Sequence, residues 1–110
     1  MGQLTVQELD DDGLEPDAGL ESADGAGDTW ENTGDEYLRV VNNGGSQVTV
    51  TVDSKQQCNF GFDHDVSVDV PAGEERLISP EDGFPPKRFG ASPDISYTDV
   101  TDVEVGVYRI

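Results

Sequence analysis

Residues 37–52 read YLRVVNNGGSQVTVTV, an apolar run, a polar and glycine-containing break, and a second run with strict alternation. In the second run Val48, Val50 and Val52 alternate with threonines, and a period of two is what a half-buried strand requires. The Asn-Gly pair at 43–44 supplies the positive φ angles of a tight turn. We therefore predict two strands, 37–41 and 48–52, paired as a β-hairpin.

The same period of two recurs further along the chain. Valines 66, 68 and 70 alternate with Ser67 and Asp69, and Pro71-Ala72-Gly73 then turns the chain into residues 76–78. Further strands are expected at 95–97 and 103–109. No window shows apolar residues at helical spacing, and glycine and proline interrupt most windows. This pattern predicts an all-β fold, an antiparallel β-sandwich or barrel of about six to eight short strands.

The first 27 residues differ from the rest of the chain. They are rich in acidic residues and glycine, and such a composition buries too little apolar area to offset the entropy of ordering. We predict an acidic N-terminal arm over 1–27, in which 3–9 is compatible with a short strand, and a β-sandwich domain over 28–110. Trp30 is expected to be an anchor in a core or an interface.

The acidic excess is the most prominent feature of the composition. Twenty-four Asp and Glu residues face six Lys and Arg residues, for a formal net charge of -18. Such a surface repels nucleic-acid backbones and anionic lipid, so neither nucleic acid nor membrane is expected as a partner. Molar salt shortens the Debye length to about 3 Å and removes most of the repulsion between carboxylates. The acidic, Lys-poor composition resembles that of proteins from halophiles with a salty cytoplasm. An acidic interaction tail on an ordinary domain is the alternative.

Residues that could carry chemistry are few. Cys58 and His64 lie close to Asp63 and Asp65, but no second Cys or His exists to complete a zinc site, so we predict no bound metal and no cofactor. The run at 10–12 lacks the alternating ligands of a calcium loop. Without a phosphate-binding glycine motif or a nucleophile elbow, the chain is not expected to be an enzyme. No long apolar run or signal peptide is present, which predicts a soluble protein, intracellular when made.

One segment combines aromatic and cationic residues in an otherwise anionic chain: Phe84-Pro85-Pro86-Lys87-Arg88-Phe89. It is compatible with a proline-stiffened loop that covers one end of the core, or with a contact patch against another acidic subunit. The hypothetical partner contacts are Phe84, Lys87, Arg88 and Phe89, together with Trp30.

A set of turn and strand motifs runs through the chain from about residue 25 to residue 110. The motifs are Gly27-Asp28-Thr29-Trp30-Glu31-Asn32-Thr33-Gly34, Tyr37 through Gly44, Cys58-Asn59-Phe60-Gly61 with His64-Asp65, Val68 through Gly73, Arg76-Leu77-Ile78, Phe84-Pro85, Arg88-Phe89, Ile95-Ser96-Tyr97, Val100 and Val103 through Arg109. On these motifs the chain resembles a family of small proteins encoded beside the major capsid protein in the head genes of tailed viruses. The chain departs from the family's pattern after Ile78, where it has Ser79-Pro80 and an acidic insertion at 81–83.

This resemblance implies a structural virion protein that decorates or cements the capsid shell by binding the major capsid protein. It implies a homo-oligomer on the capsid lattice and no catalytic residues. Together with the acidic composition, it points to a tailed virus of haloarchaea, with the protein made in the host cytoplasm and located in the virion. The alternatives are a head–tail connector or tail component, or a cellular β-sandwich module that binds carbohydrate or cations.

Overall fold

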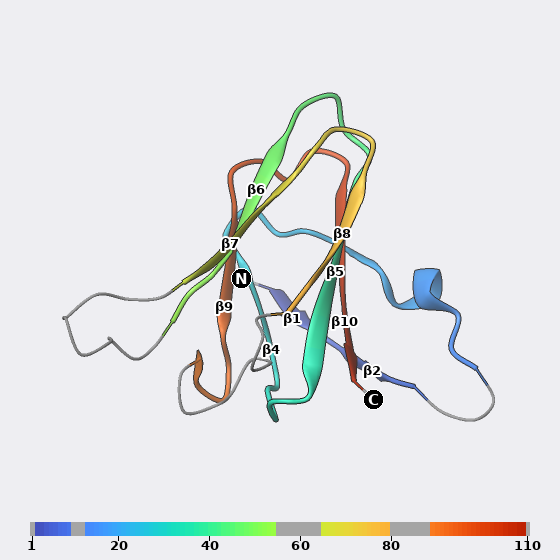
Figure 1. The fold of residues 1–110 in the computed structure, drawn as a ribbon, viewed down its shortest axis with the longest axis vertical. Helices are drawn as coiled ribbons and strands as arrows, with labels where there is room; N and C mark the ends of the chain where they lie inside the picture. Colours follow the sequence, from blue (N-terminus) through green and yellow to red (C-terminus); the bar gives the residue numbers. More distant parts are fainter. Residues whose placement is uncertain (1, 10–12, 55–64, 80–88, 110) are drawn as a thin grey trace.

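The computed structural model describes residues 2–9, 13–54, 65–79 and 89–109. These residues form ten β-strands and one short 3-10 helix at Pro16–Gly19, and the prediction of an all-β fold is confirmed (Figure 1). The strands are β1 (Gly2–Leu4), β2 (Val6–Glu8), β3 (Glu21–Ser22), β4 (Asp28–Trp30), β5 (Glu36–Asn42), β6 (Val48–Val52), β7 (Val66–Val70), β8 (Glu75–Ile78), β9 (Asp94–Tyr97) and β10 (Val103–Arg109).

The strands make two sheets that pack together as a sandwich. The first sheet has the order β1-β4-β9-β6-β7, and the second has the order β2-β10-β5-β8, with β3 also paired to β10. Most pairs are antiparallel, but β1–β4 and β2–β10 are parallel, so both sheets are mixed. Ten strands exceed the expected six to eight because the four N-terminal strands have only two or three residues each, too few to show a period.

The core lies between the two sheets and follows the predicted alternation. Strand β5 buries every second residue, and β6 does the same, so that each presents one apolar face to the other sheet. Burying each large aliphatic side chain stabilises the fold by about 1.5–3 kcal/mol. The buried apolar residues of this core are Leu4, Ala23, Trp30, Leu38, Val40, Val48, Val50, Val52, Val70, Ile78, Phe89, Ile95, Val103, Val105 and Val107.

The predicted hairpin over 37–52 is wrong, although both of its strands exist. Strand β5 pairs with β10 and β8 in the second sheet, whereas β6 pairs with β7 and β9 in the first. The intervening residues therefore carry the chain across one end of the sandwich from one sheet to the other (Figure 1). Alternation determines which face of a strand is buried, but it does not determine which neighbour the strand pairs with.

The side chain of Asn42 holds this crossing segment in place through hydrogen bonds. The side chain is fully buried, and its Nδ2 donates to the carbonyl oxygens of Ser46 at 2.8 Å and Val70 at 3.0 Å. The backbone N–H of Gly44 donates to its Oδ1 at 3.0 Å. A buried amide with all three of these partners holds β5, the crossing and β7 together, and this is a role that a hairpin turn would not need.

The N-terminal residues belong to the sandwich, which corrects the predicted boundary between an arm over 1–27 and a domain over 28–110. Strand β1 pairs with β4 in the first sheet, and β2 pairs with β10 in the second, so the chain changes sheet at Thr5. Leu4 and Ala23 are buried in the core. These strands could not be predicted from the acidic composition. The strands with which they pair, β4 and β10, lie far from them in the sequence.

Candidate binding surface

The outer face of the second sheet carries side chains that alternate with the core residues. On β5 the outward positions include Tyr37 and Arg39. The register sets Tyr37 opposite Tyr108 of β10 and Arg39 opposite Leu77 of β8. Because side chains of directly opposed residues point to the same face, these residues from three strands form one continuous surface.

Two tyrosines form the floor of this surface. The rings of Tyr37 and Tyr108 are stacked, with centroids 5.5 Å apart and an interplanar angle of 27°. Only 2% of Tyr108 is exposed. Its ring lies close to Gly106, where a Cβ atom would come within 2.8 Å of the phenol oxygen, so a larger residue there would displace the ring. The ring of Tyr108 therefore packs closely against the sheet.

A groove of about 340 Å³ lies beside the tyrosine pair. Among the described residues the exposed large hydrophobic side chains are Leu77, at 67%, and Leu9, at 39%, and both line this groove. Leu14 lines it too. Clustered apolar exposure on a soluble surface is typical of interaction sites, whereas scattered exposure is ordinary. Within the described residues the exposed leucines lie together, on a chain of net charge -18.

Arg39 lines the groove and forms hydrogen bonds with two other segments that surround it. The guanidinium donates to Asp17 at 2.6 Å and to Glu75 at 3.0 and 2.8 Å. The hydrogen bond to Asp17 raises the pKa of Arg39 above its ordinary value, against the opposing effect of burial, and Tyr108 and Glu75 raise it further. The arginine is therefore a cross-link between β5, β8 and the 3-10 helix, with its charge already balanced by two carboxylates.

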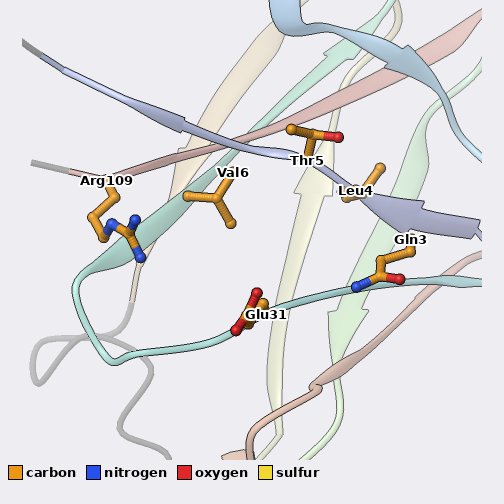
Figure 2. A pocket seen from close by; sticks show the side chains of 6 residues that line it. All are labelled: Gln3, Leu4, Thr5, Val6, Glu31 and Arg109. Carbon is orange, nitrogen blue, oxygen red and sulfur yellow. The ribbon is translucent and has the colours of Figure 1, made fainter.

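A second, more polar pocket of about 430 Å³ lies where the chain crosses between the sheets, and its lining residues are Gln3, Leu4, Thr5, Val6, Glu31 and Arg109. Figure 2 shows Thr5 at this crossing, with Arg109 on one side and Gln3 on the other. Arg109 is hydrogen-bonded to Glu8, and its guanidinium lies 3.6 Å from the carboxylate of Glu36. The cation of this pocket is thus already balanced by two carboxylates of the same chain.

Glu36 is a fully buried carboxylate with a complete set of donors. The backbone N–H groups of Thr33 and Gly34 donate to it at 2.7 and 3.3 Å, and the Thr33 hydroxyl donates as well. Burial raises the pKa of Glu36, but the hydrogen bonds from Thr33 and Gly34 and the charge of Arg109 outweigh it and lower the pKa below 4.5. A carboxyl group held ionised in this way fixes the loop before β5.

The predicted contact residues fall into two groups. Phe84, Lys87 and Arg88 lie outside the described residues, so their role stays a prediction. Trp30 and Phe89 are both 0% exposed, and their prediction as surface contacts is corrected. Large aromatic side chains gain most from burial, and here both fill the core between the sheets.

The predicted chemistry-bearing clusters lie mostly outside the described part of the chain. Cys58, Asp63, His64 and the run at 10–12 are not described, whereas Asp65 accepts a hydrogen bond from the backbone N–H of Ser54 at 2.7 Å. Within the described ranges no group of three or more His, Cys, Asp or Glu side chains could hold a metal ion. The same ranges contain no helix with the length and apolar character needed to cross a membrane.

Sequence reasoning missed the groove, because its residues come from segments far apart in the chain. One local signal was available: Leu77 and Ile78 are adjacent in a strand, and adjacent side chains point to opposite faces. Since Ile78 is buried, Leu77 must point outward. Comparison of the chain with protein-family models, with curated proteins and with solved structures gives no match.

Proposed function

We propose that this chain is a structural virion protein of a tailed virus, which decorates or cements the capsid shell by binding the major capsid protein. The observation that carries the proposal is the groove on the outer face of the second sheet. It gathers the exposed leucines 9 and 77 beside a stacked tyrosine pair, on a chain whose formal net charge is -18. A surface of this kind suits a protein that docks on another protein.

The groove is compatible with docking at high salt, and we propose that the particle is halophilic. At molar salt the Debye length is about 3 Å, so ion pairs across an interface contribute little. Apolar contacts are not screened in this way, and the core of a protein interface is depleted of charged residues. Leu9, Leu14 and Leu77 therefore supply the part of the surface that keeps its affinity in brine. The lysine and arginine at 87 and 88 contribute mainly to orientation and to binding at lower salt.

The experiment mixes purified protein with capsid shells that lack it and sediments the mixture in molar KCl. Wild type is expected to travel with the shells. Leu9→Asp places a charge in the groove and is expected to weaken shell binding at least tenfold, because the charge must be desolvated on docking. Ser96→Asp is the matched control, since it adds the same charge to an exposed site on the first sheet.

Three results would overturn the proposal. Wild type that stays in the supernatant with intact shells excludes capsid decoration. Sedimentation with tails or necks alone favours the head–tail connector or tail component. Retention by polysaccharide in place of virus particles favours the cellular carbohydrate-binding module.

A further inference from the structure

The segment between β2 and β3 passes over the outer face of the second sheet. Both flanking strands pair with β10, β2 at residues 107–109 and β3 at residues 104 and 105, so the two ends of the segment lie on the same strand. Figure 1 shows the 3-10 helix of this segment beside the second sheet, on the side that faces away from the first sheet. Residues 13–20 are called the strap below.

An aromatic side chain beside the strap points outward and yet is buried. Tyr108 lies opposite Tyr37 on the outer face, but only 2% of it is exposed. Leu14 of the strap lines the groove together with Tyr108. A Cβ atom on Gly19 of the strap would come within 2.6 Å of Cγ of Gln7, the residue opposite Tyr108 on β2. The strap therefore helps to cover a tyrosine that faces away from the core.

One ion pair with an exposed carboxylate links the strap to the sheet. Nη1 of Arg39 donates to Asp17 at 2.6 Å, and within the described residues this is the only hydrogen bond or ion pair between the strap and the strands. The Asp17 side chain is 71% exposed. The other two hydrogen bonds of the guanidinium go to Glu75 on β8 and do not involve the strap. Removing an exposed pair changes an equilibrium constant by no more than about fivefold.

We propose that the strap is displaceable, and that the partner-binding surface of the groove continues beneath it onto Tyr108. This proposal rests on the proposed function, because the partner is the protein that docks in the groove. Opening the strap breaks the link between Asp17 and Arg39 and exposes the ring of Tyr108 beside the stacked ring of Tyr37. Tyrosine is among the residues that contribute most to binding at protein interfaces. The free protein thus carries part of its docking surface covered.

Molar salt isolates this link from the other charges around it. The strap carries Glu15 and Asp17, and the outer face of the second sheet carries Glu75 and Glu104. In dilute buffer the repulsion between these carboxylates adds to the effect of any charge substitution. At molar salt the Debye length is about 3 Å, which removes most of this repulsion but leaves the direct hydrogen bond at 2.6 Å.

The test measures access to Tyr108 in molar KCl, without any shell. Tetranitromethane nitrates tyrosine rings that it can reach, and mass spectrometry of peptides assigns the product to a particular tyrosine. Asp17→Ala is expected to raise the nitration rate of Tyr108 about two- to fivefold, which is the effect of one exposed ion pair. Glu15→Ala is the matched control. It removes the same charge from the strap, but Glu15 makes no hydrogen bond or ion pair with the strands within the described residues.

Tyr97 reports the unfolding of the whole sandwich. Burial and the hydrogen bond to Asp28 raise the pKa of Tyr97, which protects it from a reagent that attacks the ionised phenol. Its nitration rate is expected to be the same in wild type and in both variants. The proposal is refuted if Tyr108 in wild type reacts only as fast as Tyr97, because global unfolding then exposes both. It is refuted equally if Asp17→Ala leaves the rate at Tyr108 unchanged, or if Glu15→Ala raises it as much.

Shell binding distinguishes a displaceable strap from a fixed wall of the groove. A protein that binds only in its open state has an affinity reduced by the open fraction. Asp17→Ala is therefore expected to strengthen shell binding about two- to fivefold in molar KCl, and Glu15→Ala to leave it unchanged. Weaker binding by Asp17→Ala would overturn the proposal. Because nitration is measured without shells, wild type that fails to bind shells contradicts the proposed function alone, whereas an unchanged rate at Tyr108 contradicts the strap alone.

Discussion

Replacing Asn42 by alanine should destabilise the protein far more than the same change at the neighbouring Asn43. The Asn42→Ala substitution removes the hydrogen bonds from Nδ2 to Val70 and Ser46 and the bond that Gly44 donates to Oδ1. The bond to the Val70 carbonyl is buried, and leaving such an acceptor without it costs about 1–3 kcal/mol. The Gly44 N–H and the Ser46 carbonyl are more exposed, so water can replace part of the lost hydrogen bond. Losing each of these two bonds therefore costs about 0.5–1.5 kcal/mol at most.

The expected loss in the free energy of unfolding is therefore about 3 kcal/mol. For a domain of this size that corresponds to a fall in the melting temperature of roughly 10 °C or more. Asn43→Ala is the control, because the side chain of Asn43 is exposed and makes one long contact, 3.4 Å, with Glu104. The Asn43→Ala substitution is expected to change the free energy of unfolding by no more than about 0.5 kcal/mol.

The assay is urea unfolding in molar KCl, followed by circular dichroism, for wild type and both variants. The reasoning is refuted if Asn42→Ala costs less than about 1 kcal/mol, or if the two alanine variants are equally destabilised. Either result would mean that the turn residues act only through their backbone conformation, as they would in an ordinary hairpin.

Three further outcomes are expected. The melting temperature should rise steeply from 0.1 M to molar KCl, since a charge of -18 is then screened; an unchanged melting temperature would remove the halophile interpretation. Leu4→Ala should lower the free energy of unfolding by about 2–5 kcal/mol, because β1 is part of the core, whereas a separate arm would give no change in urea unfolding. Glu36 has a lowered pKa when folded, so its stabilising effect is present above pH 4.5 and is lost as the pH falls through the folded pKa. The difference in urea stability between wild type and Glu36→Gln should accordingly shrink on acidification below pH 4.5, and a constant difference would contradict this.

The sequence predicts the individual strands better than their arrangement. Alternation at 48–52, 66–70 and 103–107 identifies strands that the structure contains, because a half-buried strand must repeat every two residues. The same alternation predicted the wrong neighbour for β5, since both a hairpin and a crossing between sheets bury every second residue. What distinguishes them is the buried side chain of Asn42, whose partner at Val70 lies 28 positions away.

The candidate surface was predictable only in fragments. Trp30 was expected in a core or an interface, and Phe89 in a loop over the core or in a contact patch. Both side chains are buried, which agrees with the core alternative in each case. The outward position of Leu77 follows from its neighbour Ile78, whereas its proximity to Leu9 follows only from the pairing of β2 with β10 and of β5 with β8. Such juxtapositions depend on strand order, which no local pattern in this chain encodes.

The parallel pairing of β2 with β10 has a mechanical consequence. The two strands run side by side in the same direction, with Val6 beside Val107 and Glu8 beside Arg109. A tension that pulls the chain backward from the start of β2 and forward from the end of β10 therefore acts along both strands in opposite senses. It shears the hydrogen bonds of the pair together rather than opening them one after another, as it would at the end of an antiparallel hairpin. The sandwich is consequently built to resist stretching along the direction of these two strands.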